Sequence, residues 1–154
     1  MACAACAGIR SKPEEAPLSR TFYTVTAEIA LARHQPRVAA LQYAAAAANE
    51  TDPGLLGRAT AVAAEGLQPT VAETVAARWT EVDPKSVDAQ RAAAQAALAL
   101  HQIDREAAHY RIVLQRSPIG TDAEFAALEA YRADNDNIFG SRQLADRLAP
   151  SFPS

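Results

Sequence analysis

The sequence predicts an all-α protein in which about four antiparallel helix pairs stack side by side as an α-α superhelix. About a quarter of the 154 residues are alanine, the residue with the highest intrinsic helix propensity. Proline, glycine, aspartate and serine interrupt the alanine-rich segments at short intervals, as they do at helix ends. No run of β-branched residues has the alternating pattern of a strand.

Helix-start signals divide the first half of the chain into four predicted helices. Pro36 and Pro69 each open a helix, because proline is tolerated at the first helical position. Asp52 is expected to cap the helix that begins at Pro53, and Gly66 suits the end of that helix. The four predicted helices cover residues 20–34, 36–49, 53–65 and 69–81.

The second half predicts four more helices. Asp104 is expected to be an N-cap, and the Ser117-Pro118 pair ends the helix that Asp104 begins. Thr121 opens the next helix, the polar stretch 134–137 interrupts the chain, and Ser141 begins a short last helix. These helices cover residues 86–100, 104–116, 121–133 and 141–149.

A period in the breaker prolines groups these helices into pairs. Pro53, Pro84, Pro118 and Pro153 each follow a second helix, and they are 31, 34 and 35 residues apart. A period of ~34 residues is typical of helix-turn-helix repeats. Each pair has an apolar face that it cannot bury alone, so the pairs are expected to stack and share one core over residues 19–153.

Residues 1–18 form a polar, proline-containing leader, which we expect to be disordered. The formal net charge is −3 with both signs interspersed, so no basic stripe indicates nucleic-acid binding. No apolar run is long enough to cross a bilayer. Cys3 and Cys6 lie too close to the N-terminus to hold a fold together.

The residues within each period resemble the tetratricopeptide repeat. That pattern places small residues inside both helices of a pair, a bulky residue four positions after the second of these, and a proline at the exit. The first pair matches it with Ala27, Ala39, Tyr43 and Pro53; the third matches it with Ala94, Ala107 (one place late), Tyr110 and Pro118. The resemblance covers residues 20–153 and implies a superhelix with a concave groove.

A narrower resemblance concerns the N-terminal repeats of proteobacterial tetratricopeptide lipoproteins of the outer membrane. It rests on Thr51-Asp52-Pro53, Arg58-Ala59-Thr60, Ala63, Ala76-Ala77-Arg78-Trp79 and Pro84. Known members bring substrates to a periplasmic carboxyl-terminal processing protease. The resemblance implies a periplasmic location, with an outer-membrane lipid anchor at Cys6, which follows two small residues as in a lipoprotein cleavage site. A cytoplasmic location is the alternative, because no apolar segment precedes Cys6.

In a tetratricopeptide array the first helix of each pair lines the concave groove, and this implies a partner-binding surface. Glu28 stands where related proteins that grip a carboxylate have a cation or an amide, so a carboxylate ligand is disfavoured. Small neutral positions in the second pair (Gly54, Gly57, Ala61 and Ala64) instead favour an apolar segment of another protein. The groove residues expected in the first and third pairs are Thr24, Glu28, Leu31, Asp88, Arg91, Gln95 and Leu98.

The last pair carries several bulky apolar residues, although arrays normally end in a polar capping helix. We expect a terminal packing face there, for another copy, a partner protein or further repeats. Its residues are Ile138, Phe139, Leu144, Leu148 and Phe152.

No catalytic, cofactor or metal constellation stands out in the sequence. His34, His101 and His109 do not have the i, i+4 spacing of a metal-binding pair, and no glycine-rich phosphate loop is present. The sequence therefore favours a non-enzymatic scaffold or adaptor in the bacterial envelope that binds another protein. The alternatives are a self-assembling repeat module and a helical domain that binds a small ligand.

Overall fold

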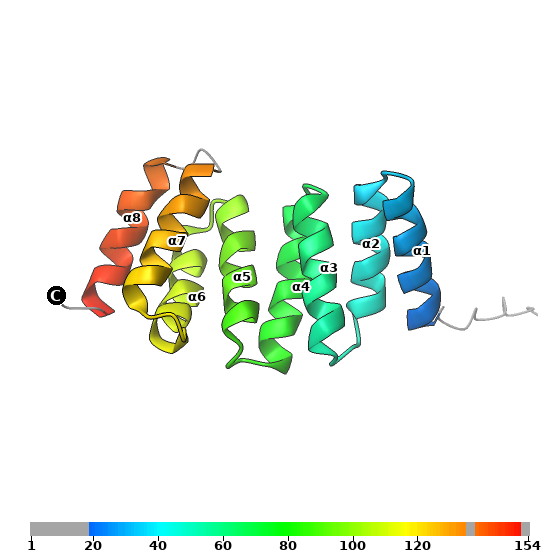
Figure 1. Cartoon of the computed structure of the whole chain (residues 1–154), viewed down its shortest axis with the longest axis horizontal. Helices are drawn as coiled ribbons and strands as arrows, with labels where there is room; N and C mark the ends of the chain where they lie inside the picture. The colour runs from blue at the N-terminus through cyan, green and yellow to red at the C-terminus, as the bar shows by residue number, and fades with distance from the viewer. Residues whose placement is uncertain (1–18, 135–137, 152–154) are drawn as a thin grey trace, which may run out of the picture.

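Eight α-helices follow one another in the computed structural model, which describes residues 19–134 and 138–151. Consecutive helices pack against each other, and Figure 1 shows them in a row from α1 at one end to α8 at the other. The described residues contain no strand, so the all-α prediction is confirmed. The elements are α1 (Arg20–Ala32), α2 (Pro36–Ala47), α3 (Pro53–Glu65), α4 (Pro69–Val82), α5 (Val87–Ala99), α6 (Ile103–Arg116), α7 (Thr121–Asp134), α8 (Ile138–Leu148) and a short 3-10 turn, η1 (Ala149–Ser151).

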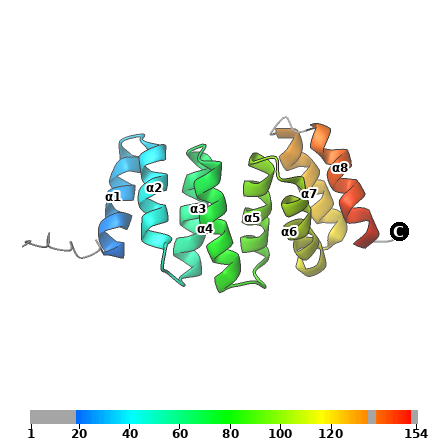
Figure 2. The same ribbon diagram turned by 180° about the vertical axis from the view of Figure 1, so that it is seen from behind.

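The helices form two layers. Besides neighbours in sequence, three further pairs of helices are in contact: α2 with α4, α3 with α5, and α6 with α8. These contacts place first helices beside first helices in one layer, and second helices beside second helices in the other. Figure 2 shows the molecule from behind, with the same order of helices along the row.

A turn of constant geometry joins the two helices in each of the first three pairs. His34, Leu67 and His101 all have a positive φ, of 53 to 57°, and they are 33 and 34 residues apart. In each turn the next residue is a glutamine whose backbone N–H donates to a carbonyl five residues earlier, over 2.9 Å. This left-handed C-terminal motif satisfies carbonyls that the helix end would leave unpaired.

Caps at the start of the first helices recur with the same spacing. The side chains of Ser19, Asp52 and Ser86 accept hydrogen bonds from backbone N–H groups in the first turns of α1, α3 and α5. These caps satisfy donors that a helix N-terminus otherwise leaves free. The prediction for Asp52 and Pro53 is confirmed, and two independent signals now mark a repeat of about 34 residues.

Gly66 directly follows the last residue of α3, as predicted. Its φ is −77°, and the left-handed conformation falls on Leu67 instead. A Cβ at Gly66 would lie 3.0 Å from the backbone oxygen of Pro36, so glycine is needed because the start of α2 approaches closely. The residue permits contact between the first two pairs.

Two predicted helix starts are wrong. The sixth helix begins at Ile103 with Gln102 as its N-cap residue, so Asp104 lies inside the first turn, where it pairs with Arg147. The eighth helix begins at Ile138 and not at Ser141. In both places the chain re-enters a helix earlier than its polar residues suggested, which agrees with the general uncertainty of element boundaries.

Candidate binding groove

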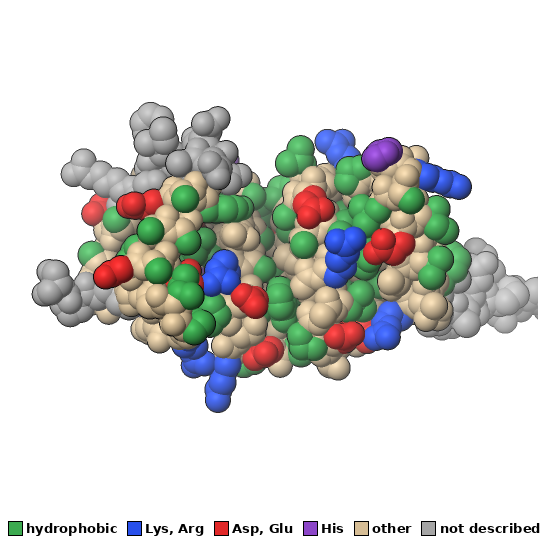
Figure 3. All heavy atoms as spheres, viewed as in Figure 1, with side chains coloured by type: hydrophobic (Ala, Val, Ile, Leu, Met, Phe, Trp, Pro, Cys, Tyr) green, Lys and Arg blue, Asp and Glu red, His purple; other side chains and the backbone are tan. Residues whose placement is uncertain are grey.

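A hollow of about 510 Å³ lies on the side of the molecule formed by the first helices of the pairs. It spans α3, α4 and α5, and Tyr131 reaches it from α7. Small or apolar residues make up most of its wall, which Figure 3 shows from the side viewed in Figure 1. The lining residues are Gly57, Thr60, Ala61, Ala64, Leu67, Pro69, Ala72, Trp79, Ala92, Gln95, Ala96, Ala99 and Tyr131.

Trp79 is the largest side chain in this wall, and Gly57 makes room for it. A Cβ at Gly57 would lie 2.9 Å from the Cη2 atom of the Trp79 ring, a separation that real contacts do not reach. Trp79 Nε1 is buried and has no hydrogen-bond partner among the described residues. A buried N–H without a partner is rare, and this one is closed off from solvent, so it is not offered to the open hollow.

Polar groups in the wall are few and mostly engaged. The Thr60 hydroxyl is buried and donates to the backbone oxygen of Leu56 one turn earlier in α3, over 2.9 Å. Burial raises the pKa of Tyr131, with a further contribution from the nearby Glu106 carboxylate, so the phenol is neutral at pH 7. The hollow therefore contains no charged group.

On the N-terminal side of the hollow, the charged residues neutralise one another. Tyr43 donates a hydrogen bond to Glu28, and Arg58 lies 3.5 Å from the same carboxylate. The Arg58 guanidinium also lies 5.8 Å from the centre of the Tyr43 ring, in cation–π geometry. This cluster joins α1, α2 and α3 and leaves Glu28 without a free charge for a ligand.

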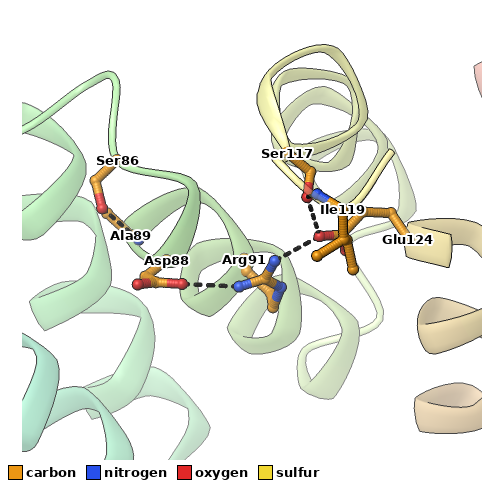
Figure 4. A network of polar contacts seen from close by, with 7 residues as sticks. All are labelled: Ser86, Asp88, Ala89, Arg91, Ser117, Ile119 and Glu124. Carbon is orange, nitrogen blue, oxygen red and sulfur yellow. Dashed lines mark hydrogen bonds and ion pairs between the residues drawn. The ribbon is translucent and has the colours of Figure 1, made fainter. Parts of the chain in front are cut away.

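A second cluster of charged residues lies on the C-terminal side, where one arginine pairs with two carboxylates. Arg91 lies between two carboxylates, 2.8 Å from Asp88 Oδ1 and 2.7 Å from Glu124 Oε1 (Figure 4). The Ser117 hydroxyl donates to the same Glu124 oxygen over 2.6 Å. Because Glu124 is almost fully buried, the Arg91 contact ties α5 to α7 more strongly than an exposed pair would.

The structure divides the predicted groove residues. Gln95 lines the hollow, as do Gly57, Ala61 and Ala64 of the second pair. Leu98 does not, because it is only 4% exposed and belongs to the core. The remaining residues lie on the first helices outside the hollow: Thr24, Glu28, Leu31, Asp88 and Arg91.

The sequence analysis missed nine of the lining residues: Thr60, Leu67, Pro69, Ala72, Trp79, Ala92, Ala96, Ala99 and Tyr131. Leu67, Pro69, Ala72 and Trp79 come from the turn after α3 and from α4, which the assignment to first helices excluded. One signal could have found Trp79. Glycine inside a helix often marks a close approach, and Gly57 is such a residue in a chain with a single tryptophan.

The predicted terminal packing face is not formed as expected. Leu144 and Leu148 are 2% and 1% exposed, and they pack inside the molecule against Tyr110, Val113 and Leu114. They are part of the core because α8 lies against α6 as well as α7. The side chains of Ile138 and Phe139, and all of Phe152, lie outside the described residues.

The histidines are not grouped. His34 and His101 occupy the left-handed turns, and His109 Nδ1 lies 2.7 Å from the amide oxygen of Gln90. An amide oxygen only accepts, so Nδ1 donates. Burial lowers the pKa of His109, and the positive charge of Arg105 adds to this, so the ring is neutral at pH 7. No three metal-ligating side chains come together in residues 19–134 and 138–151.

The comparisons with known proteins give no relative. No protein-family model matches the sequence, and no curated protein matches it. Among the described residues no helix has the length and apolar character needed to span a bilayer. A lipid at Cys6 stays a prediction, because that residue lies outside the described part of the chain.

Proposed function

We propose that this chain is a protein-interaction scaffold, a tetratricopeptide-like superhelix whose groove takes an uncharged, apolar segment of another protein. The observation that carries the proposal is the hollow itself, with a wall of alanine, glycine and tryptophan between two clusters whose charged side chains are engaged in ion pairs. An apolar segment would bury this wall and would not have to break an ion pair. The repeated turns and caps support a tetratricopeptide-like array.

The wall offers a partner few polar groups, since the Thr60 hydroxyl is already bonded within α3 and the Trp79 N–H is buried. A charged carboxylate is a poorer match, because Glu28 and Glu124 lie at the two sides of the groove.

The test uses random twelve-residue peptides displayed on phage and selected on the full chain. Selected peptides should be apolar and uncharged, and they should change the fluorescence of Trp79, the only tryptophan. Ala61→Glu adds a charge to the wall and should weaken binding at least tenfold, since the carboxylate would be desolvated. Ala108→Glu, at another exposed alanine inside a helix, should leave affinity unchanged.

Equal losses in the two variants, or selection of charged peptides only, would contradict the groove assignment. The volume of the hollow also lies within the range of small-molecule pockets, so a small apolar ligand is the second candidate. Peptides that share one central sequence but differ in the flanking residues distinguish these two candidates. A protein segment gains affinity from residues outside the hollow, whereas a pocket for a small ligand does not respond to them.

A further inference from the structure

The outer side of the first pair carries large apolar side chains that are about half exposed. Phe22, Val25 and Ile29 are 47 to 52% exposed, and they follow one another along one face of α1. On α2, Val38 and Leu41 are 44% and 57% exposed and one turn apart. Both faces point away from the buried alanines of their helices. We call these five residues the end face.

The end face lies at one extreme of the row of helices. α1 and α2 form that extreme in Figure 1, and Figure 3 shows hydrophobic side chains along this edge of the molecule. In a stack of helix pairs each inner pair is covered on both sides. The described residues cover the first pair on one side only, so its apolar stripe faces solvent.

The opposite extreme has a different character. Leu144 and Leu148 of α8 are buried, and among the described side chains of this helix Gln143, Asp146 and Arg147 are exposed. Stacking the end face of one molecule on α8 of the next would place apolar residues against charged ones. Such head-to-tail growth is therefore disfavoured, and a contact between two end faces is favoured.

Charges at the two ends of the end face are of opposite sign. Near the α1–α2 turn, Arg33 and Arg37 are exposed, and neither takes part in an ion pair among the described residues. At the other end, Arg20 lies 3.3 Å from Glu50 and 3.9 Å from Asp52. One arginine cannot neutralise two carboxylates, so this end keeps a net negative charge.

We propose that the end face binds a second copy of this chain in a two-fold, antiparallel arrangement. The two-fold axis lies perpendicular to the helices, so that Arg33 and Arg37 of each copy meet Glu50 and Asp52 of the other. An axis parallel to the helices would instead bring the arginines of the two copies together, which like-charge repulsion opposes. The contact uses the same patch twice, so it closes at a dimer.

This inference goes beyond the proposed groove and does not depend on it. The two surfaces share no residue, and the groove remains open in such a dimer. Each dimer would therefore present two grooves. A partner with two matching segments would bind more tightly than one with a single segment, because the second contact becomes intramolecular.

Sedimentation velocity of the full chain tests the proposal. The mass should rise with concentration from that of the 16.3 kDa monomer to twice that value, and it should go no higher. Ile29→Glu should weaken dimerisation at least a hundredfold while the helical circular dichroism stays unchanged. Ile119→Glu is the matched control, because Ile119 is 60% exposed but lies in a turn far along the chain, and this variant should still dimerise.

Charge exchange tests the antiparallel geometry. Arg37→Glu and Glu50→Arg should each weaken the dimer about tenfold, and the double variant should recover most of the loss. A wild-type chain that stays monomeric at several hundred micromolar would overturn the proposal and would mean that another occupant covers the face. If Ile29→Glu did not weaken the dimer, the proposed interface would also be wrong. If Arg37→Glu strengthened the dimer, the antiparallel arrangement would be wrong.

Discussion

The hydrophobic cores of the two halves of the molecule differ in amino-acid composition. The cluster formed by α1–α4 together with Ala96 of α5 consists mostly of buried alanines, with only Tyr43, Leu56, Val62 and Val75 as larger members. The cluster of α5–α8 contains two alanines, and its other buried members are leucine, valine and tyrosine. Alanine lets helix axes approach closely, whereas larger residues hold them apart. The same arrangement of helix pairs can therefore have a core of small residues, with the helices close together, or a core of large side chains, with the helices farther apart.

The halves also differ in their buried charges. In the second half Arg132 and Glu106 form an ion pair, and the two side chains are 2% and 1% exposed. Of the ion pairs among the described residues of the first four helices, every one has an exposed arginine. A buried pair holds its partners in one geometry, but it costs more to disturb than an exposed pair.

The largest expected effect comes from that buried pair. Arg132→Met leaves the Glu106 carboxylate buried without its cation and should lower the free energy of unfolding by about 3–5 kcal/mol. Hydrogen exchange should show the loss in α6–α8, with α1–α4 still protected. Adding Glu106→Leu should restore most of the stability.

The control for this effect is Arg105→Met, the same substitution at an arginine that is 54% exposed and pairs with Glu73. Exposed pairs contribute ~0–1 kcal/mol, so urea unfolding should change little. Similar losses for Arg105→Met and Arg132→Met would show that burial does not distinguish the two pairs.

The same carboxylate gives a pH dependence. Burial raises the pKa of Glu106 above its ordinary value of 4.5, although the contact with Arg132 acts in the opposite direction. Between the ordinary and the raised pKa the folded chain binds more protons than the unfolded chain, so stability should fall as pH rises through this interval. Urea midpoints measured from pH 4 to 7 should show this slope, and Glu106→Gln should reduce it.

Core substitutions should lower stability in both halves, but for opposite reasons: removing volume from one core and adding volume to the other. Leu144→Ala removes a side chain that is 2% exposed and should cost about 2–5 kcal/mol through the cavity that it leaves. Ala59→Leu, at a fully buried alanine between close helices, should cost about 1–3 kcal/mol through overpacking. Thermal unfolding measures both. An Ala59→Leu chain as stable as wild type would mean that the first half is loosely packed.

The smallest expected effect is a gain, and it should be equal in both halves. His34 and His101 hold the left-handed conformation at equivalent turns, where glycine carries no Cβ penalty. His34→Gly and His101→Gly should each raise the free energy of unfolding by ~0.5–1 kcal/mol. If only one of them does so in urea unfolding, the two turns are not equivalent.

The sequence predicts the features that depend on neighbouring residues in the chain, but not those that depend on packing between helices. Local signals placed Pro36, Pro53 and Pro69 at the first positions of their helices, and the cap at Asp52 is as expected. The burial of Leu144 could not be predicted locally, because it depends on the packing of α8 against α6. Trp79 was missed for the same reason, since its place in the wall depends on α3.

The unexpected turn residues follow the same rule. Glycine is the usual residue for a positive φ, yet His34, Leu67 and His101 adopt it. The hydrogen bonds of the turn are formed by backbone atoms, so they do not specify a side chain. A sequence pattern based on residue types therefore does not detect the repeat at these positions, whereas the backbone conformation shows it.

The linear order of the helices has a mechanical consequence. Because α1 and α8 lie at opposite ends of the row, a pull between them would act on the contacts between successive pairs in series, so every joint would carry the same force. Bridges such as Glu28 to Arg58, Glu73 to Arg105 and Arg91 to Glu124 would carry this tension across the joints. Under load the chain would extend in steps of one helix pair, and the joint with the weakest contacts would open first.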